Sequence, residues 1–165
     1  MPAPTDSHPA VARVLAALAV HGVDPEVRHL PDAVRTAAAA AEAVGVTPGE
    51  IANSLVFRTT TRDGEALPLL VLASGSHRVD TAKVAALADL ASVDRADAEY
   101  VRATTGFAIG GVAPVGHTTP LRTIVDVDLG RYETVWAAAG HSHSVFATTY
   151  DELLRITGGQ PMEVT

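Results

Sequence analysis

Apolar residues recur every three or four positions along residues 9–21, and this spacing predicts a helix that ends at Gly22. An alanine-rich segment at 36–44 predicts a second helix, which Gly45 would end. Three further helices are expected, at residues 80–88, 96–104 and 151–156. Because these helices are short, we expect them to pack against a β-sheet rather than against one another.

Segments rich in β-branched and apolar residues predict strands between these helices. Residues 54–60 and 67–73 flank a polar turn at 62–65, which is the pattern of a β-hairpin. Further strands are expected at 27–30, 122–127, 134–138, 144–148 and 162–164. Because strands and helices do not alternate in a regular βαβ order, we expect an α+β fold with a mixed β-sheet surrounded by helices. Residues 9–165 would form this single domain, and residues 1–8 a flexible N-terminal leader.

Composition agrees with one globular domain, since 47% of the 165 residues are apolar and 19% are charged. The chain has no cysteine, which excludes disulfides, thiol nucleophiles and thiolate metal sites. No apolar run approaches the roughly twenty residues that span a bilayer, and the first residues lack the pattern of a secretory signal. We therefore expect a cytoplasmic protein with no membrane partner.

The charge balance limits how the protein could contact nucleic acid. The formal net charge is −7, and Lys83 is the only lysine among the 12 basic residues. The arginines are scattered, whereas a protein that follows a long nucleic-acid backbone carries a basic stripe. DNA is therefore not an expected partner, and any contact with RNA must be local, such as one strand end, or must depend on a partner protein.

Residues 110–117 form a loop with glycine at 110, 111 and 116 and proline at 114. The glycines allow close approach of the backbone to a ligand, and Pro114 stiffens the middle of the loop. Such a loop could hold a small group through main-chain N–H donors. It could equally be a tight connector between two core elements.

Signatures of phosphate-binding loops, dinucleotide sites and nucleophile elbows are missing. Residues 74–77 place two serines beside His77, but adjacency in sequence is not triad geometry, and capping serines in a turn are the simpler interpretation. His141 and His143 would share one face of a strand and could bind a metal with His117, although no acidic residue completes the set. We expect no metal, and a histidine that serves as hydrogen-bond donor or general base. Asp126 and Asp128 are expected to cap the following turn.

Several segments, taken in order, resemble the YbaK/prolyl-tRNA-editing domains, which are aminoacyl-tRNA deacylases. The most recognisable piece is the Gly-x-x-x-Pro motif from Gly110 to Pro114. The matching segments are 51–57, 71–83, 105–117, 124–126, 139–141 and 151–154. Together they extend over roughly residues 25–158, and an ordered set of this density is much more specific than any single match.

The resemblance implies hydrolysis of the ester that joins a wrong small amino acid to the 3′ end of a tRNA, typically the tRNA for proline. Water, helped by the terminal ribose hydroxyl, would attack the carbonyl, while the protein orients the groups and stabilises the oxyanion. No cofactor is implied. The partner would be the acceptor end of a mischarged tRNA, delivered with or without an aminoacyl-tRNA synthetase or elongation factor.

The resemblance also assigns candidate residues. The catalytic candidates are Asn53, Gly110, Gly111 and His141. The substrate-binding candidates are Ser54, Lys83, Val112, Ala113, Pro114, Gly116, His117 and Gly140. One departure matters, because Asn53 stands where the family usually has a pocket lysine, and an amide supplies no positive charge. Two alternatives follow: a catalytically silent binding module of the same fold, and a metal-dependent hydrolase that uses His117, His141 and His143.

Overall fold

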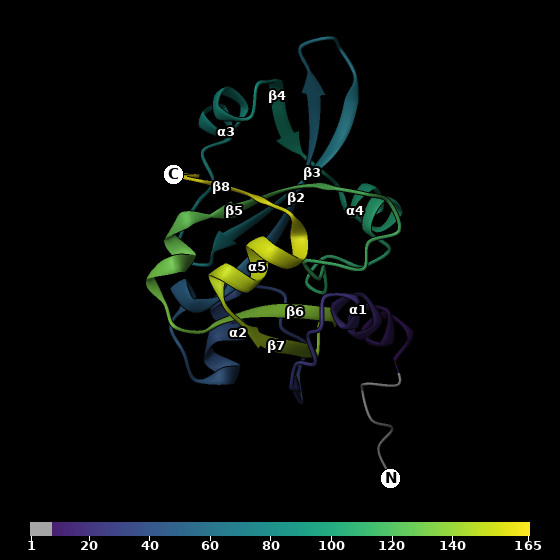
Figure 1. Cartoon of the computed structure of the whole chain (residues 1–165), viewed down its shortest axis with the longest axis vertical. Coiled ribbons are helices and arrows are strands. Elements are labelled where there is room, and N and C mark those ends of the chain that lie inside the picture. The colour runs from purple at the N-terminus through teal and green to yellow at the C-terminus, as the bar shows by residue number, and fades with distance from the viewer. Residues whose placement is uncertain (1–7) are drawn as a thin grey trace.

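Two β-sheets with helices around them make up the part of the chain that the computed structural model describes, residues 8–165 (Figure 1). The leader expected at 1–8 falls outside this part, apart from His8, whose Nδ1 accepts the Ala10 N–H and so caps the first helix. The α+β class is confirmed. The mixed sheet that we expected is five-stranded, and a separate antiparallel sheet accompanies it.

The five-stranded sheet has the order β4-β2-β3-β5-β8. The central hairpin pairs β2 with β3 antiparallel, as the sequence predicted, and Gly64 at φ +88° lies in its turn. β5 runs parallel to β3, and β8 runs parallel to β5. The strands are β2 Ala52–Thr61, β3 Ala66–Ser74, β4 Leu90–Arg95, β5 Arg122–Asp126 and β8 Gln160–Met162.

The three-stranded sheet has the order β1-β7-β6 and is antiparallel throughout. Its strands are β1 Val27–His29, β6 Val135–His141 and β7 Ser144–Thr148. A parallel bridge between Ile51 and Trp136 brings the start of β2 against β6. The two sheets therefore meet at the point where β2 begins.

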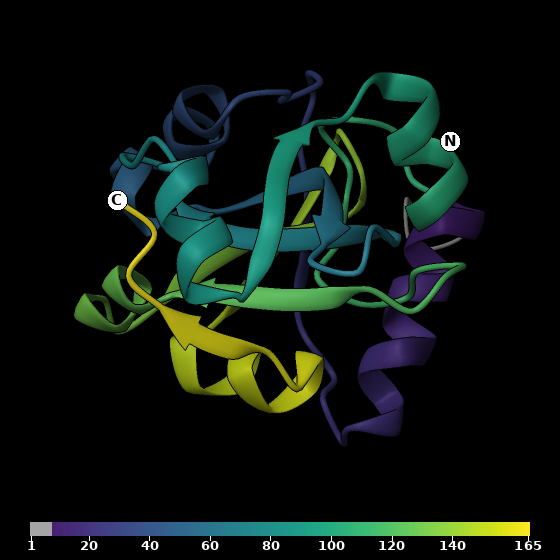
Figure 2. The same cartoon turned by 90° about the horizontal axis from the view of Figure 1, so that it is seen from above.

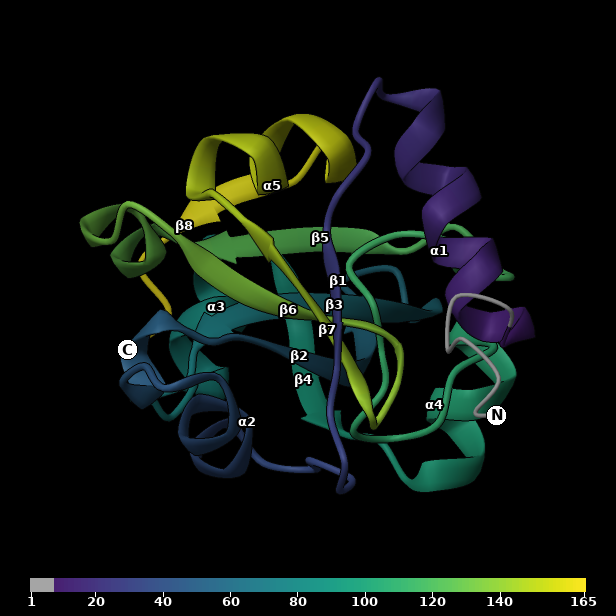
Figure 3. The ribbon, with the colours of Figure 1, turned by 90° about the horizontal axis from the view of Figure 1, so that it is seen from below.

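Helices lie at two sides of the sheets, with α1 and α4 at one side and α2 and α3 at the other (Figures 2 and 3). The local sequence sets their limits: the hydroxyl of Thr36 caps α2, Gly45 ends it at φ +80°, and Asp80 caps α3. The α-helices are α1 Pro9–Val20, α2 Ala37–Val44, α3 Thr81–Leu87, α4 Ala98–Thr105 and α5 Tyr150–Thr157. Two short 3₁₀ helices are η2 Pro48–Glu50 and η3 Val127–Arg131. In the described residues, no helix has the length and apolar character needed to cross a bilayer.

The core follows the alternation of side chains along the hairpin. Even-numbered residues such as Val56 and Leu70 face the larger cluster, which includes Phe107 and Phe146. Odd-numbered residues such as Leu69 and Val71 face α3, β4 and β8. A third cluster joins α2 to Ile51, Trp136 and Val145. The two faces of the β2–β3 hairpin are thus covered by other elements, which leaves the ends and edges of its strands for a ligand.

Three predictions of local structure need correction. The sequence interpretation did not include β4, which begins after Asp89 at φ +59°. The helix expected at 96–104 is Ala98–Thr105, because Asp97 provides its N-cap. The last strand lies at Gln160–Met162 rather than at 162–164.

Candidate active site

A cavity of about 430 Å³ opens where β2 begins. Its walls come from four parts of the chain: the approach to α2 and its first turns, the start of β2 with Gly75, the loop at Ile109–Gly110–Val112, and β6 with Val145. Of the predicted site residues, the structure brings four together here: Asn53, Ser54, Gly110 and Val112. Alanines make up much of the remaining wall, at positions 37, 38, 40, 52, 137 and 138.

One edge of β2 is open beside this cavity. β4 pairs with β2 only from Phe57 to Thr61, so among residues 8–165 the first half of β2 has no paired strand on that side apart from the bridge between Ile51 and Trp136. At the two ends of the hairpin, odd-numbered Ile51 and Thr61 hydrogen-bond towards β3. Because an antiparallel strand alternates its hydrogen bonds between its two sides, Ser54 directs its N–H and C=O to the open edge.

Asn53 and Ser54 carry polar groups without partners. The carboxamide of Asn53 is partly exposed and makes no hydrogen bond with any residue of 8–165. The Oγ of Ser54 is buried and has no partner in the same part of the chain. Buried polar atoms are nearly always hydrogen-bonded, so an unpaired hydroxyl on a cavity wall calls for a ligand or a water.

Gly110 fits this wall because it has no side chain. It has φ +92°, and a Cβ added to it would lie 3.0 Å from the Cγ of Arg35 and 3.3 Å from its Cα. Sequence reasoning missed Arg35, whose exposed side chain is the one ionisable group lining the cavity within residues 8–165. The segment 31–36 offered no motif to indicate it, since the contact joins residues far apart in the chain.

Gly111 packs against the end of β6, where a Cβ would lie 3.0 Å from the Cα of His141. The His141 ring lies between two others, with ring centroids 4.5 Å from His8 and 5.0 Å from His143. Burial lowers the pKa of His141, and positive charge on His8 or His143 lowers it further. The His143 N–H donates to His141 Nδ1, so the neutral ring carries its proton on Nε2. His141 is therefore arranged as a hydrogen-bond donor.

The far side of the loop faces a second cavity of about 340 Å³, lined in part by Pro114, Gly116 and His117. His117 Nε2 donates to the Ala113 carbonyl at 2.7 Å. Burial lowers the pKa of His117, the hydrogen bond to Ala113 opposes this, and the charge of Arg13 adds to the lowering. The loop thus separates two cavities, with Ala113 fully buried within it.

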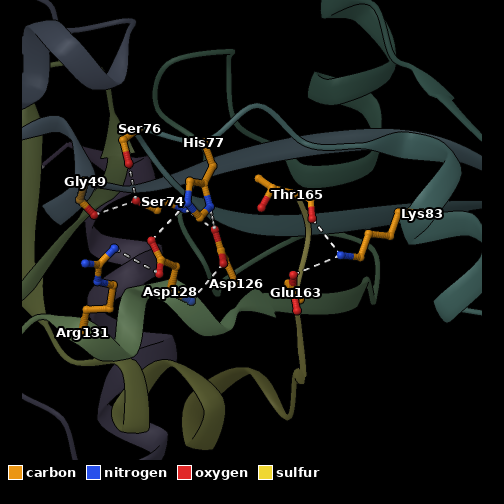
Figure 4. A network of polar contacts seen from close by, with 10 residues as sticks. All are labelled: Gly49, Ser74, Ser76, His77, Lys83, Asp126, Asp128, Arg131, Glu163 and Thr165. Atoms are coloured by element: carbon orange, nitrogen blue, oxygen red, sulfur yellow. Dashed lines mark hydrogen bonds and ion pairs between the residues drawn. The ribbon is translucent and has the colours of Figure 1, made fainter.

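Two other predicted site residues lie elsewhere. Lys83 Nζ donates to the carbonyl of Thr165 at 2.7 Å and to Glu163 at 3.2 Å (Figure 4). Gly140, at φ +100°, approaches α1, where a Cβ would lie 2.7 Å from the Ala10 carbonyl oxygen. Neither residue lines the 430 Å³ cavity.

His77, shortly after the end of β3, bridges two carboxylates (Figure 4). Its Nδ1 lies 2.7 Å from Asp126 Oδ2 and its Nε2 lies 3.0 Å from Asp128 Oδ2. Asp126 also accepts the N–H groups of Ser74 and Asp128, so it caps η3 as expected and additionally fixes the end of β3. The Ser74 hydroxyl donates to Gly49 O rather than to the imidazole, which rules out a serine–histidine pair here.

Metal coordination finds no support in the geometry. Across residues 8–165, no three His, Cys, Asp or Glu side chains are grouped so that they could hold a metal ion. The arrangement of His117, His141 and His143 that the metal-dependent alternative requires is therefore absent from the described residues. The cavity has instead an amide, a hydroxyl, main-chain groups and one arginine.

Comparison with known proteins assigns the class. The profile of the aminoacyl-tRNA editing domain matches residues 31–156, and the chain belongs to this family. It is 33% identical over 114 residues to "Uncharacterized protein YwhH" of Bacillus subtilis (strain 168), covering 69% of each chain. It is 25% identical over 130 residues to "Putative Cys-tRNA(Pro)/Cys-tRNA(Cys) deacylase EbsC" of Enterococcus faecalis (strain ATCC 700802 / V583), covering 79% of this chain and 77% of the relative.

A solved structure extends the likeness to nearly the whole fold. The crystal structure of "a putative trans-editing enzyme for prolyl tRNA synthetase" superposes with a TM-score of 0.84 at 43% identity. The match covers 95% of this chain and 97% of the other. The family resemblance drawn from the sequence is therefore confirmed.

Proposed function

We propose that this protein is a trans-acting deacylase, which hydrolyses the ester between a small amino acid and the 3′ end of a mischarged tRNA, with tRNA for proline as the expected substrate. The observation that carries the proposal is the cavity at the start of β2. It combines a small apolar wall with unpaired polar groups on Asn53 and Ser54. Membership of the editing-domain family supports the same reaction.

The cavity wall suits selection by size. Alanine and glycine line much of it, so a small side chain can enter without displacing a large neighbour. One methylene in an apolar pocket changes binding by only about 1–3 kcal/mol, which is why editing requires a second site that admits small products. A larger amino acid would meet Trp136 and Val145.

Chemistry in this cavity would depend on orientation rather than on a protein nucleophile. Among residues 8–165, the unpaired donors on this part of β2 include the Asn53 carboxamide N–H and the Ser54 hydroxyl, which leave β2 on opposite faces, and the Ser54 main-chain N–H at the open edge. At least one of them would donate to an ester oxygen. One donor aimed at a developing oxyanion is worth about 3–4 kcal/mol of barrier. Water would attack the carbonyl, helped by the neighbouring ribose hydroxyl of the tRNA. His141 does not line the cavity, so no direct contact with the ester is assigned to it.

The net negative charge of the protein is compatible with binding only the acceptor end of a tRNA. With a net charge of −7, the protein would repel most of a tRNA backbone, so an aminoacyl-tRNA synthetase or elongation factor is a fitting partner for delivery. Charged tRNAs are used in the cytoplasm, which we propose as its location.

A panel of mischarged tRNAs tests the proposal. Purified protein should deacylate at least one small aminoacyl ester well above the uncatalysed rate, and Asn53→Ala should reduce that rate. Ser54→Ala should also reduce it, and Ser92→Ala is the matched control for that variant, because Ser92 lies on β4 and does not line the cavity. A rate no higher than that of free aminoacyl-tRNA for every substrate would refute the enzymatic reading.

The silent binding module is the second candidate, and it rests on the amide at position 53. If the wild type binds a non-hydrolysable aminoacyl-adenosine but does not turn over the ester, Asn53→Lys decides between the two. Activity that appears only in this variant would favour the silent module. Activity already present in the wild type would exclude it.

A further inference from the structure

Arg35 stands apart from most arginines of this chain. Its side chain lines the 430 Å³ cavity and is exposed, and it makes no hydrogen bond, ion pair or ring contact with residues 8–165. Seven other arginines have such partners: Arg13, Arg28, Arg58, Arg62, Arg122, Arg131 and Arg155. An unpaired guanidinium at a cavity is an available anion-binding group.

The backbone around Arg35 is held from both sides. The N–H of Val34 donates to the Ser142 carbonyl at 2.8 Å, and this ties the segment to the turn between β6 and β7. On the other side, Thr36 caps α2 by accepting the Ala39 N–H. The side-chain stem of Arg35 lies against Gly110. The guanidinium is thus carried on a fixed base at the wall of the cavity and beside the Gly-x-x-x-Pro loop.

Charge is the property that the cavity otherwise lacks. Asn53 and Ser54 are neutral, and no other ionisable side chain lines the cavity within the described residues. An aminoacylated RNA end is anionic, because a phosphate joins its last nucleoside to the one before. A guanidinium binds phosphate through two parallel hydrogen bonds, which gives orientation as well as affinity.

We propose that Arg35 binds the phosphate that joins the terminal nucleoside to the rest of the acceptor strand, and that it supplies the positive charge that Asn53 cannot. This inference rests on the proposed function, since it takes an aminoacylated RNA end as the ligand. Arg35 is then the residue that makes the cavity prefer an RNA end over a free aminoacyl-nucleoside.

Two probes separate the phosphate from the rest of the ligand. The first is a short RNA hairpin ending in CCA, with the amino acid attached through a stable 3′-amide. The second is the matching 3′-aminoacylamino-adenosine, which has no phosphate. Arg35→Ala should weaken binding of the hairpin about tenfold or more, because a charge-assisted contact is lost, and should leave the nucleoside unchanged.

Salt dependence gives a second readout that a structural defect would not reproduce. Losing one phosphate contact on a single strand should reduce the slope of log affinity against log salt by about 0.7. Arg35→Lys should keep much of this slope, because it keeps the charge. Arg102→Ala is the matched control. Arg102 lies on α4 and is exposed, as Arg35 is, but it does not line the cavity. Equal melting temperatures for the variants exclude misfolding as the cause.

The outcomes are distinguishable from those for the proposed function. Hairpin binding that depends on Arg35 in a protein that hydrolyses no ester would support this inference and refute the deacylase. Equal weakening of both probes, an unchanged salt slope, or failure of the wild type to bind the hairpin would overturn the inference. Ester hydrolysis that is unaffected by Arg35→Ala at substrate concentrations well below KM would also overturn it.

Discussion

The buried carboxylate of Asp126 offers the sharpest test of how the cavity is supported. Only 1% of its side chain is exposed, and it accepts the N–H of Ser74, the N–H of Asp128 and a ring N–H of His77. In Asp126→Asn, the single amide oxygen can keep the Asp128 contact. The new NH₂ group then faces the Ser74 N–H, which can only donate, and His77 Nδ1, which can accept only if the ring moves its proton to Nε2.

The size of the effect follows from these contacts. A hydrogen bond to a charged group is worth about 1.5–3 kcal/mol; the one from Ser74 is lost and its N–H is left buried without a partner, while the one with His77 loses its charge. The contact with Ser74 is buried, whereas 23% of the His77 side chain is exposed, so solvent screens that part. We expect Asp126→Asn to lower the free energy of unfolding by about 3–5 kcal/mol, and the melting temperature by roughly 10 °C.

Urea denaturation followed by the fluorescence of Trp136, the only tryptophan, measures this change at the cavity wall itself. Asp128→Asn is the control, because Asp128 contacts the same imidazole but is 24% exposed. Its expected cost is below about 1 kcal/mol. If the two variants lose the same stability, or if Asp126→Asn costs less than about 1 kcal/mol, the reasoning about the buried carboxylate is wrong.

Three further predictions concern the loop and the start of β2. The folded state lowers the pKa of His117 below the usual 6.5. The contribution of His117 to the free energy of unfolding should therefore be complete above about pH 6.5 and be lost as the pH falls through the folded pKa. Urea midpoints measured at pH 7.5 and 5.0 should then differ less in His117→Gln than in the wild type. Gly110→Ala should lower the free energy of unfolding by about 1–3 kcal/mol, which is more than Gly64→Ala should. Both glycines have positive φ, but only at Gly110 would the new Cβ contact a side chain, that of Arg35. Equal losses in the two variants would contradict this close packing. Ser54→Ala should leave the melting temperature unchanged or raise it, because the Ser54 hydroxyl has no hydrogen-bond partner to lose. The same variant should reduce deacylation. A clear loss of stability would mean that the hydroxyl does have a hydrogen-bond partner.

Local chemistry explains which elements could be predicted from the sequence. Thr36, Gly45 and Asp80 act on their own helix ends, and each stands within a few residues of the group that it satisfies. β4 could not be predicted this way, because Leu90–Arg95 holds few β-branched residues and its strand conformation depends on pairing with β2.

The same distinction applies to the candidate site. The family resemblance pointed to Gly110 and Asn53, which the fold brings to one cavity. The resemblance did not indicate Arg35, whose contact is with a glycine 75 positions later in the chain. Nor could it foresee that His77 would join Asp126 rather than a serine. Contacts between distant segments are set by packing, which a motif does not record.

The pairing of β1 with β7 has a consequence for how the protein is made. Val27 pairs with Phe146, so the smaller sheet joins the first strand of the described residues to the last strand but one (Figure 3). During synthesis the β2–β3 hairpin can form early, whereas β1 waits unpaired until β7 has left the ribosome. Such long-range pairing slows folding and exposes the waiting strand to aggregation. Because β6 and Val145 form one wall of the cavity, the site is completed late, and a chain interrupted before Val145 would carry the Gly-x-x-x-Pro loop without a complete pocket.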